Sequence, residues 1–163
     1  MTLSAAERER LADVVRLQPT KNKELQECWE MESGSEVHGY LEEHLSDYYY
    51  RNEDSYICAT PEAAELTGVE PGVEGDEDGV DVIRVPELEA QVFEVVAGPD
   101  ERSESVVSVL QKIREAFDAD PEVDAVREAL QSLRRKGVVE VVYRTVPTFK
   151  LAVERDGVDV EVV

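Results

Sequence analysis

Apolar residues recur at helical spacing towards the carboxyl-terminal end of the chain. Val126, Leu130 and Leu133 lie at positions i, i+4 and i+7, the period of one buried stripe on an α-helix. Gly137 can take the left-handed backbone conformation just past the end of such a helix. Two β-rich runs, VVEVVY and FKLAV, then flank a turn over residues 144–148. This pattern predicts an amphipathic helix followed directly by a β-hairpin.

The first part of the chain predicts three helices and a hairpin in a similar order. The helices are expected over residues 5–17, from residue 21 to about 30, and around the stripe Val37, Leu41 and Leu45. Their expected amino-terminal caps are Ser4, with Glu7 completing a capping box, then Thr20, and then Ser33 or Ser35. The last elements are expected to be strands at Tyr48–Tyr50 and Tyr56–Cys58 and a short helix from Thr60 to Leu66, with Gly68 past its end.

The second part begins with a short apolar run over Val82–Val85. A helix is expected from Pro86, and another opens at Ser103 or Ser105, before the helix and hairpin described first. The pair Asp156-Gly157 lies between LAVER and VDVEVV and is typical of a two-residue hairpin turn. It therefore predicts a third strand in the sheet of that hairpin.

Residues 69–81, VEPGVEGDEDGVD, are rich in glycine and acid and show no periodicity. Such a composition predicts a linker that is extended by its own charge repulsion. Asp76, Glu77 and Asp78 lack the alternating oxygen ligands and flanking helices of a calcium-binding loop. We therefore expect one domain over residues 1–68, an acidic glycine-rich linker over 69–81 and a second domain over 82–163.

Both parts resemble the winged helix-turn-helix family. In the second part the resemblance rests on VDAVREALQSLRRKGVVEVVYRTVPTFKLAV, a helix capped by glycine and followed by a hairpin "wing". In the first part it rests on PTKNKELQECWEMESGSEVHGYLEEHL, YYYR and YICATPEAAEL, which include the TPEA step that often follows the wing in archaeal regulators. The resemblance implies an α+β fold of two winged helix-turn-helix domains in tandem, each a three-helix core with a β-hairpin wing. The whole chain also resembles an uncharacterised haloarchaeal family, which implies nothing about function.

Charge changes this picture. The 163 residues include 38 acidic and 17 basic side chains, giving a net charge of −21, whereas nucleic-acid binders usually carry a positive charge. Many carboxylates with few lysines resemble the surfaces of cytoplasmic proteins from salt-loving archaea; an acidic bacterial protein is the alternative. At molar salt the Debye length is about 3 Å, so global charge is a poor guide to partners.

One segment reverses the sign of the charge. From Arg134 to Arg155 the chain has six basic residues and two acidic ones, a local charge of +4. This predicts a phosphate partner, namely double-stranded DNA. The alternative is that Arg134, Arg135 and Lys136 only complement the negative end of the helix dipole. The candidate DNA-binding residues are Arg127, Gln131, Arg134, Arg135, Lys136, Arg144 and Lys150, with Lys21 and Lys23 in the first domain.

No residue pattern predicts an enzyme, a cofactor or a metal site. Cys28 and Cys58 form neither a metal set nor a disulfide framework, so we expect two free thiols. His38 and His44 are six residues apart on one expected helix, whereas paired metal ligands on a helix use i, i+4. No apolar run approaches the roughly 18 residues of a membrane span, so the chain is expected to be soluble and cytoplasmic, with no membrane partner.

Three functions stay open at this point. The first is a halophile-adapted, DNA-binding transcriptional regulator that uses its winged helices. The second is a protein-interaction scaffold, because the layout and charge are similar to those of acidic chromosome-segregation proteins, whose tandem winged helices grip a partner chain and form homodimers. The third is a small-molecule or redox sensor that acts through Cys28 and Cys58.

Overall fold

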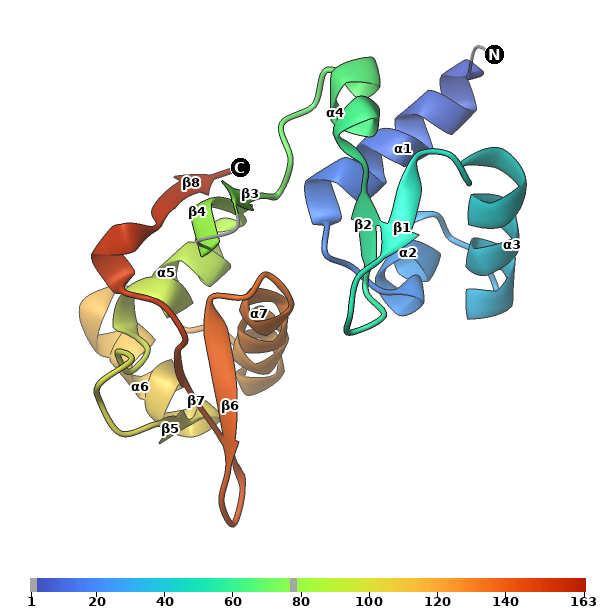
Figure 1. Cartoon of the computed structure of the whole chain (residues 1–163). Helices are drawn as coiled ribbons and strands as arrows, with labels where there is room; N and C mark the ends of the chain where they lie inside the picture. Colours follow the sequence, from blue (N-terminus) through green and yellow to red (C-terminus); the bar gives the residue numbers. More distant parts are fainter. Residues whose placement is uncertain (1–2, 77–78) are drawn as a thin grey trace. The chain divides into compact units, whose positions relative to one another are not determined.

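The computed structural model describes residues 3–76 and 79–163. This part of the chain is a mixed α+β structure with seven α-helices and eight short strands. It divides into two compact units: unit 1 ends at Gly72 and unit 2 begins at Val73 (Figure 1). Among the residues that the structure describes, no helix has both the length and the apolar character needed to cross a membrane.

Unit 1 is a small helical body with one hairpin. Its elements are α1 (Ala5–Leu17), α2 (Asn22–Cys28), α3 (Gly34–His44), β1 (Tyr49–Arg51), β2 (Ile57–Ala59) and α4 (Pro61–Thr67). The predicted stripe of α3 is confirmed, because Val37, Leu41 and Leu45 are fully buried. They share one apolar core with side chains from α1, α2 and β2.

Local capping signals fix where three of these helices begin. The Ser4 N–H donates to Glu7 Oε1 at 2.8 Å and the Glu7 N–H donates to Ser4 Oγ at 3.1 Å, so the predicted capping box is confirmed. Ser33 caps α3 and Thr60 caps α4 through hydroxyl oxygens that accept backbone N–H groups. Gly68 takes the left-handed conformation at the end of α4, with φ +70°.

The prediction that Thr20 caps α2 is wrong. The helix begins at Asn22, with Lys21 at the cap position, while Thr20 is fully buried in extended backbone pairing. The Thr20 N–H donates to Ile57 O at 2.9 Å and the Ile57 N–H donates to Thr20 O at 2.7 Å. Buried backbone groups need such partners. The segment between α1 and α2 therefore adds to strand β2 of the hairpin.

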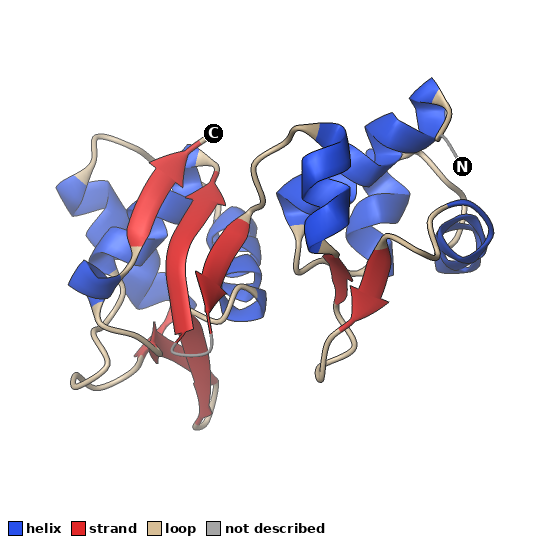
Figure 2. Cartoon of the chain, turned by 45° about the horizontal axis from the view of Figure 1, so that its top comes forward, coloured by secondary structure: helices blue, strands red, loops and turns tan. Residues whose placement is uncertain are grey.

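Unit 2 combines three helices with two sheets. Its elements are β3 (Val73–Asp76), β4 (Gly79–Val85), α5 (Glu87–Val95), β5 (Glu104–Ser105), α6 (Val106–Ala116), α7 (Val123–Arg135), β6 (Val139–Tyr143), β7 (Pro147–Leu151), a 3-10 turn (Arg155–Gly157) and β8 (Asp159–Val162). One sheet has the order β3-β4-β8 and the other β5-β7-β6. Figure 2 shows β3, β4 and β8 side by side.

The stripe of α7 is the centre of this unit. Val126, Leu130 and Leu133 are each fully buried, as predicted, and pack in one core with side chains of α5, α6 and the hairpin β6–β7. Gly137 follows the helix with φ +86°, which confirms the expected left-handed residue. The core therefore holds α7 against the hairpin that comes directly after it.

The linker expected over residues 69–81 is wrong for its described part. Val73 pairs with Ile83 and Glu74 with Val82 in an antiparallel ladder, so these residues belong to a sheet. Val69 packs against the core of unit 1, and Val73 and Val80 pack against the core of unit 2. Three half-buried valines of the stretch therefore pack against the two cores, which its acidic composition did not indicate. Residues 77 and 78, which the linker prediction included, lie outside the described residues.

The expected hairpin at Asp156-Gly157 is also wrong. Strand β8 instead pairs in parallel with β4, with Val82 opposite Asp159 and Val85 opposite Val162. The third strand beside β6 and β7 is β5, which pairs Glu104 with Phe149. The Arg155 side chain donates to the carbonyls of Phe93 and Val96 in α5 and at its end, which anchors the 3-10 turn before β8. An Asp-Gly pair marks a turn without specifying which strand pairs next.

Two glycines of unit 1 should respond oppositely to alanine. A Cβ on buried Gly72 would lie 2.3 Å from the carbonyl oxygen of Arg16, whereas a Cβ on Gly39, within α3, meets nothing within 4 Å. We expect Gly72→Ala to lower the free energy of unfolding by about 1–3 kcal/mol through overpacking. Gly39→Ala should raise it by about 0.5–1 kcal/mol through helix propensity. Urea unfolding measures both, and a stable Gly72→Ala variant would contradict this packing.

Candidate functional site

The helix α7 exposes one polar face. Arg127, Gln131 and Arg134, at i, i+4 and i+7, lie about 100° round the helix from the buried stripe, and we call them the outer face of α7. Arg127 and Arg134 are exposed and Gln131 is half-buried. Arg127 Nη1 lies 2.5 Å from Asp124 Oδ1, so one of these cations already has an acidic neighbour. The outer face therefore carries two guanidinium groups and one amide.

Arg135 and Lys136, two of the predicted DNA contacts, are buried, with 8% and 7% of their surfaces exposed. Lys136 Nζ donates to Ser132 Oγ at 2.6 Å and lies 3.1 Å from Glu89 Oε1, and Ser132 Oγ donates to the same carboxylate at 2.7 Å. The prediction that these two cations form part of a surface patch is therefore wrong. Lys136 faces α5, where the Glu89 carboxylate engages its ammonium group.

The hairpin β6–β7 and its continuation place the remaining basic residues in different environments. Arg144 lies exposed at the turn, where its Nε is 3.4 Å from Ser103 Oγ. Lys150 is half-buried, with Nζ 3.4 Å from Glu140 Oε1 and a hydrogen bond to the carbonyl of Pro99. Arg155 is engaged by backbone carbonyls of α5 and its end. The segment from Arg134 to Arg155 has six cations. Among the residues that the structure describes, only Arg134 and Arg144 of these six are exposed and have no ion pair.

The candidate residues of unit 1 are fewer and weaker. Lys21 is half-buried at the start of α2 and Lys23 is exposed on its first turn. The outer side of α3 presents Glu36, His38 and Glu42. The Tyr49 hydroxyl donates to the Glu42 carboxylate, and burial together with this bond raises the pKa of Tyr49 to about 12. This face is acidic rather than cationic.

Unit 1 contains an aromatic cluster that was not predicted from the sequence. The guanidinium carbon of Arg10 lies 4.5 Å from the ring centre of Tyr40 and 5.4 Å from that of Trp29, which are cation–π distances. His44 stacks on Tyr40, and its Nδ1 lies 2.9 Å from Glu7 Oε2. These contacts tie α1, α2 and α3 together. They give His44 a structural role at the amino-terminal end of α1.

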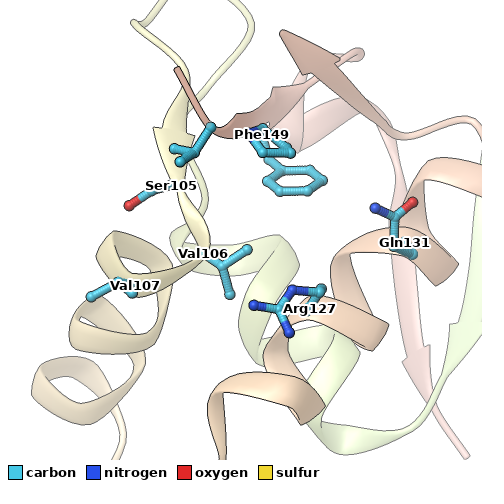
Figure 3. A pocket seen from close by; sticks show the side chains of 8 residues that line it. Ser105, Val106, Val107, Arg127, Gln131 and Phe149 are labelled. Atoms are coloured by element: carbon cyan, nitrogen blue, oxygen red, sulfur yellow. The ribbon is translucent and has the colours of Figure 1, made fainter. Parts of the chain in front are cut away.

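A pocket in unit 2 was also missed. Its volume is about 270 Å³, and it lies between the start of α6, the outer face of α7 and strand β7 (Figure 3). It is lined by Ser105, Val106, Val107, Arg127, Gln131, Val146, Pro147 and Phe149. The available sequence signal was Val107, an apolar residue on the solvent side of α6 that is 52% exposed. Arg127 and Gln131, both predicted site residues, thus line a pocket whose other walls are mostly apolar.

The thiols and histidines form no cluster of this kind. Cys28 is exposed and Cys58 is buried, and both are free. Burial is the main cause that raises the pKa of each thiol. In the part of the chain that the structure describes, no three His, Cys, Asp or Glu side chains are grouped to hold a metal ion.

Comparison with known proteins finds one family. The model described as "Family of unknown function (DUF5797)" matches residues 3–163, nearly the whole chain. No curated protein matches the chain, and no solved structure matches it.

Buried Lys136, at the end of α7, should contribute more to the free energy of unfolding than exposed Arg134. Lys136→Met leaves the Glu89 carboxylate, only 14% exposed, without its cation. Breaking a buried ion pair on one side costs about 3–5 kcal/mol. The matched Arg134→Met change on the exposed face should alter the free energy of unfolding by less than about 0.5 kcal/mol. Guanidinium unfolding compares the two. Adding Glu89→Met to Lys136→Met should restore most of the loss, and equal effects of the two single changes would contradict the burial.

Proposed function

The chain belongs to the DUF5797 family of unknown function, and we propose that it is a DNA-binding regulator built from two winged helices in tandem. The support for the fold is the repeated order of elements. In each unit a helix, an extended segment, two helices and a hairpin follow one another, and the extended segment pairs with the second hairpin strand. The pairs are Thr20 with β2 and β5 with β7. This repeated order supports the proposal of one winged helix-turn-helix in each unit.

The outer face of α7 is the observation that carries the DNA proposal. In helix-turn-helix proteins the last of the three helices enters the major groove. Arginine reads guanine there through two hydrogen bonds, and glutamine reads adenine. Arg127, Gln131 and Arg134 occupy this face in unit 2, and the hairpin turn adds Arg144, which would meet a phosphate.

The charges imply an unusual mode of binding. Three arginines at most would meet phosphates, so the slope of log affinity against log salt should be roughly −3 or shallower. Such binding survives high salt better than that of a strongly basic protein. We infer that the carboxylate-rich surface is an adaptation to concentrated salt, as in halophilic archaea. The protein would then work in the cytoplasm, by binding rather than by catalysis.

A second candidate function is a protein-interaction scaffold. The observation that favours it is the apolar character of the hairpin turn, where Tyr143 is 71% and Val146 is 53% exposed on either side of Arg144. A DNA backbone offers such side chains little, whereas protein interfaces are enriched in tyrosine. The partner would be another protein or a second copy of this chain.

Reversing two exposed cations tests the DNA proposal. DNA that co-purifies with the native protein supplies the sequence for anisotropy titrations at high potassium chloride. We expect Arg134→Glu with Arg144→Glu to weaken binding at least tenfold, because each lost contact is replaced by repulsion from phosphates. Arg102→Glu, an exposed cation in the loop after α5, is the matched control and should bind normally.

Two outcomes would contradict the proposal. One is unchanged affinity of the double variant. The other is purification with a stoichiometric protein partner and no enriched DNA, which would favour the scaffold.

A further inference from the structure

The pocket of unit 2 has the composition of a ligand site. Three elements build it: Ser105 to Val107 at the start of α6, Arg127 and Gln131 on α7, and Val146 to Phe149 at the hairpin. Most of its wall is apolar, and Phe149, itself only 1% exposed, is a fixed part of the core behind it. Apolar walls with a few placed polar groups are typical of small-molecule sites.

The volume limits what the pocket can hold. At about 270 Å³ it lies just below the usual range of ligand pockets, which begins near 300 Å³. A cavity of about 150 Å³ in another protein holds benzene. The pocket therefore has room for one ring, or a branched chain of similar size, together with one polar substituent. A nucleotide or a sugar chain is too large and too polar for it.

The two polar side chains select the substituent. Arg127 and Gln131 are one turn apart on α7, and Figure 3 shows them on the same side of the pocket, across from Val106 and below Phe149. Asp124 engages only Nη1 of Arg127. A guanidinium has five N–H donors, so Nε and Nη2 are left to offer a carboxylate two hydrogen bonds. The amide of Gln131 can donate a third.

The charged residues of α7 near Arg127 favour a ligand with a single negative charge. A cationic ligand would meet Arg127, and a dianion would meet repulsion from Asp124 and Glu128 on the same helix. A monoanion would share the guanidinium with Asp124 and would meet less repulsion from these carboxylates than a dianion. We propose that this pocket binds a small monocarboxylic acid with an apolar body, its carboxylate on Arg127 and Gln131 and its body against Val106, Val146 and Phe149.

Acid binding does not depend on the DNA-binding function, but the two sites would share residues. Arg127 and Gln131 belong both to the pocket and to the outer face of α7. A bound acid would occupy the donors that a base or phosphate needs. Acid and DNA would therefore exclude each other, and the acid would release the protein from DNA.

The test uses the full chain in concentrated potassium chloride and methyl NMR spectra of its valines. The probes are phenylacetate, benzoate and 4-methylpentanoate, each paired with its neutral amide. We expect saturable shifts of the Val106, Val107 and Val146 methyl signals with at least one acid, and at least tenfold weaker binding of its amide.

Variants separate the carboxylate contact from simple apolar binding. Arg127→Gln should weaken binding of the acid about tenfold and leave the amide unchanged. Val146→Asp, at a position already 53% exposed, should abolish acid binding without unfolding the chain. Arg102→Gln is the control for an exposed arginine outside the pocket and should bind the acid normally.

The proposal is overturned if no acid gives saturable shifts, if acid and amide bind equally, or if Arg127→Gln binds the acid normally. A DNA arm keeps the two proposals distinguishable. Saturable acid binding that leaves DNA affinity unchanged supports the pocket and contradicts the placement of DNA on the outer face of α7. Absence of DNA binding with intact acid binding contradicts the DNA proposal alone.

Discussion

Burial of one stripe of α7 decides which of its polar side chains can meet a partner. Successive residues of a helix are about 100° apart, so the fully buried Val126, Leu130 and Leu133 fix the direction of every other side chain. Arg134 is exposed, while Lys136 is buried against Glu89 of α5 and Arg135 is also buried. Two cations are thus absent from the surface of unit 2. The polar side chains that α7 leaves accessible are Arg127, Arg134 and half-buried Gln131, beside the exposed Asp124 and Glu128.

Local features of the fold were predictable because they depend on neighbouring residues. The capping box of Ser4 and Glu7, the cap at Ser33 and the left-handed Gly137 all follow from the chemistry of a single turn. Strand pairing was not predictable in this way. Thr20 pairs with Ile57, and β8 pairs with β4 about 77 residues earlier, from Val82 opposite Asp159. Such contacts depend on which edge is free in the folded unit, and the local sequence carries no signal for that.

The candidate site was predictable only in part, for a related reason. Helical spacing was enough to predict that Arg127 and Gln131 share one face of α7, because this requires one element alone. Counting charge along the chain overstated the basic surface, because the count ignores rotation about the helix and the carboxylates that fold against Lys136 and Lys150. The pocket requires three elements that come together only in the folded unit, so no single segment showed it.

A strongly acidic chain can still recognise an anion if recognition acts at short range. At low salt the net charge of −21 repels DNA and acids over long distances. Concentrated salt shortens the Debye length to about 3 Å and removes most of this repulsion, while hydrogen bonds made in direct contact with Arg127 remain. Acid and DNA that both use Arg127 and Gln131 must weaken each other by the same factor, because coupling between binding equilibria is reciprocal. A small acid bound at these two residues would therefore control DNA binding by direct competition, and neither unit would need to change its fold.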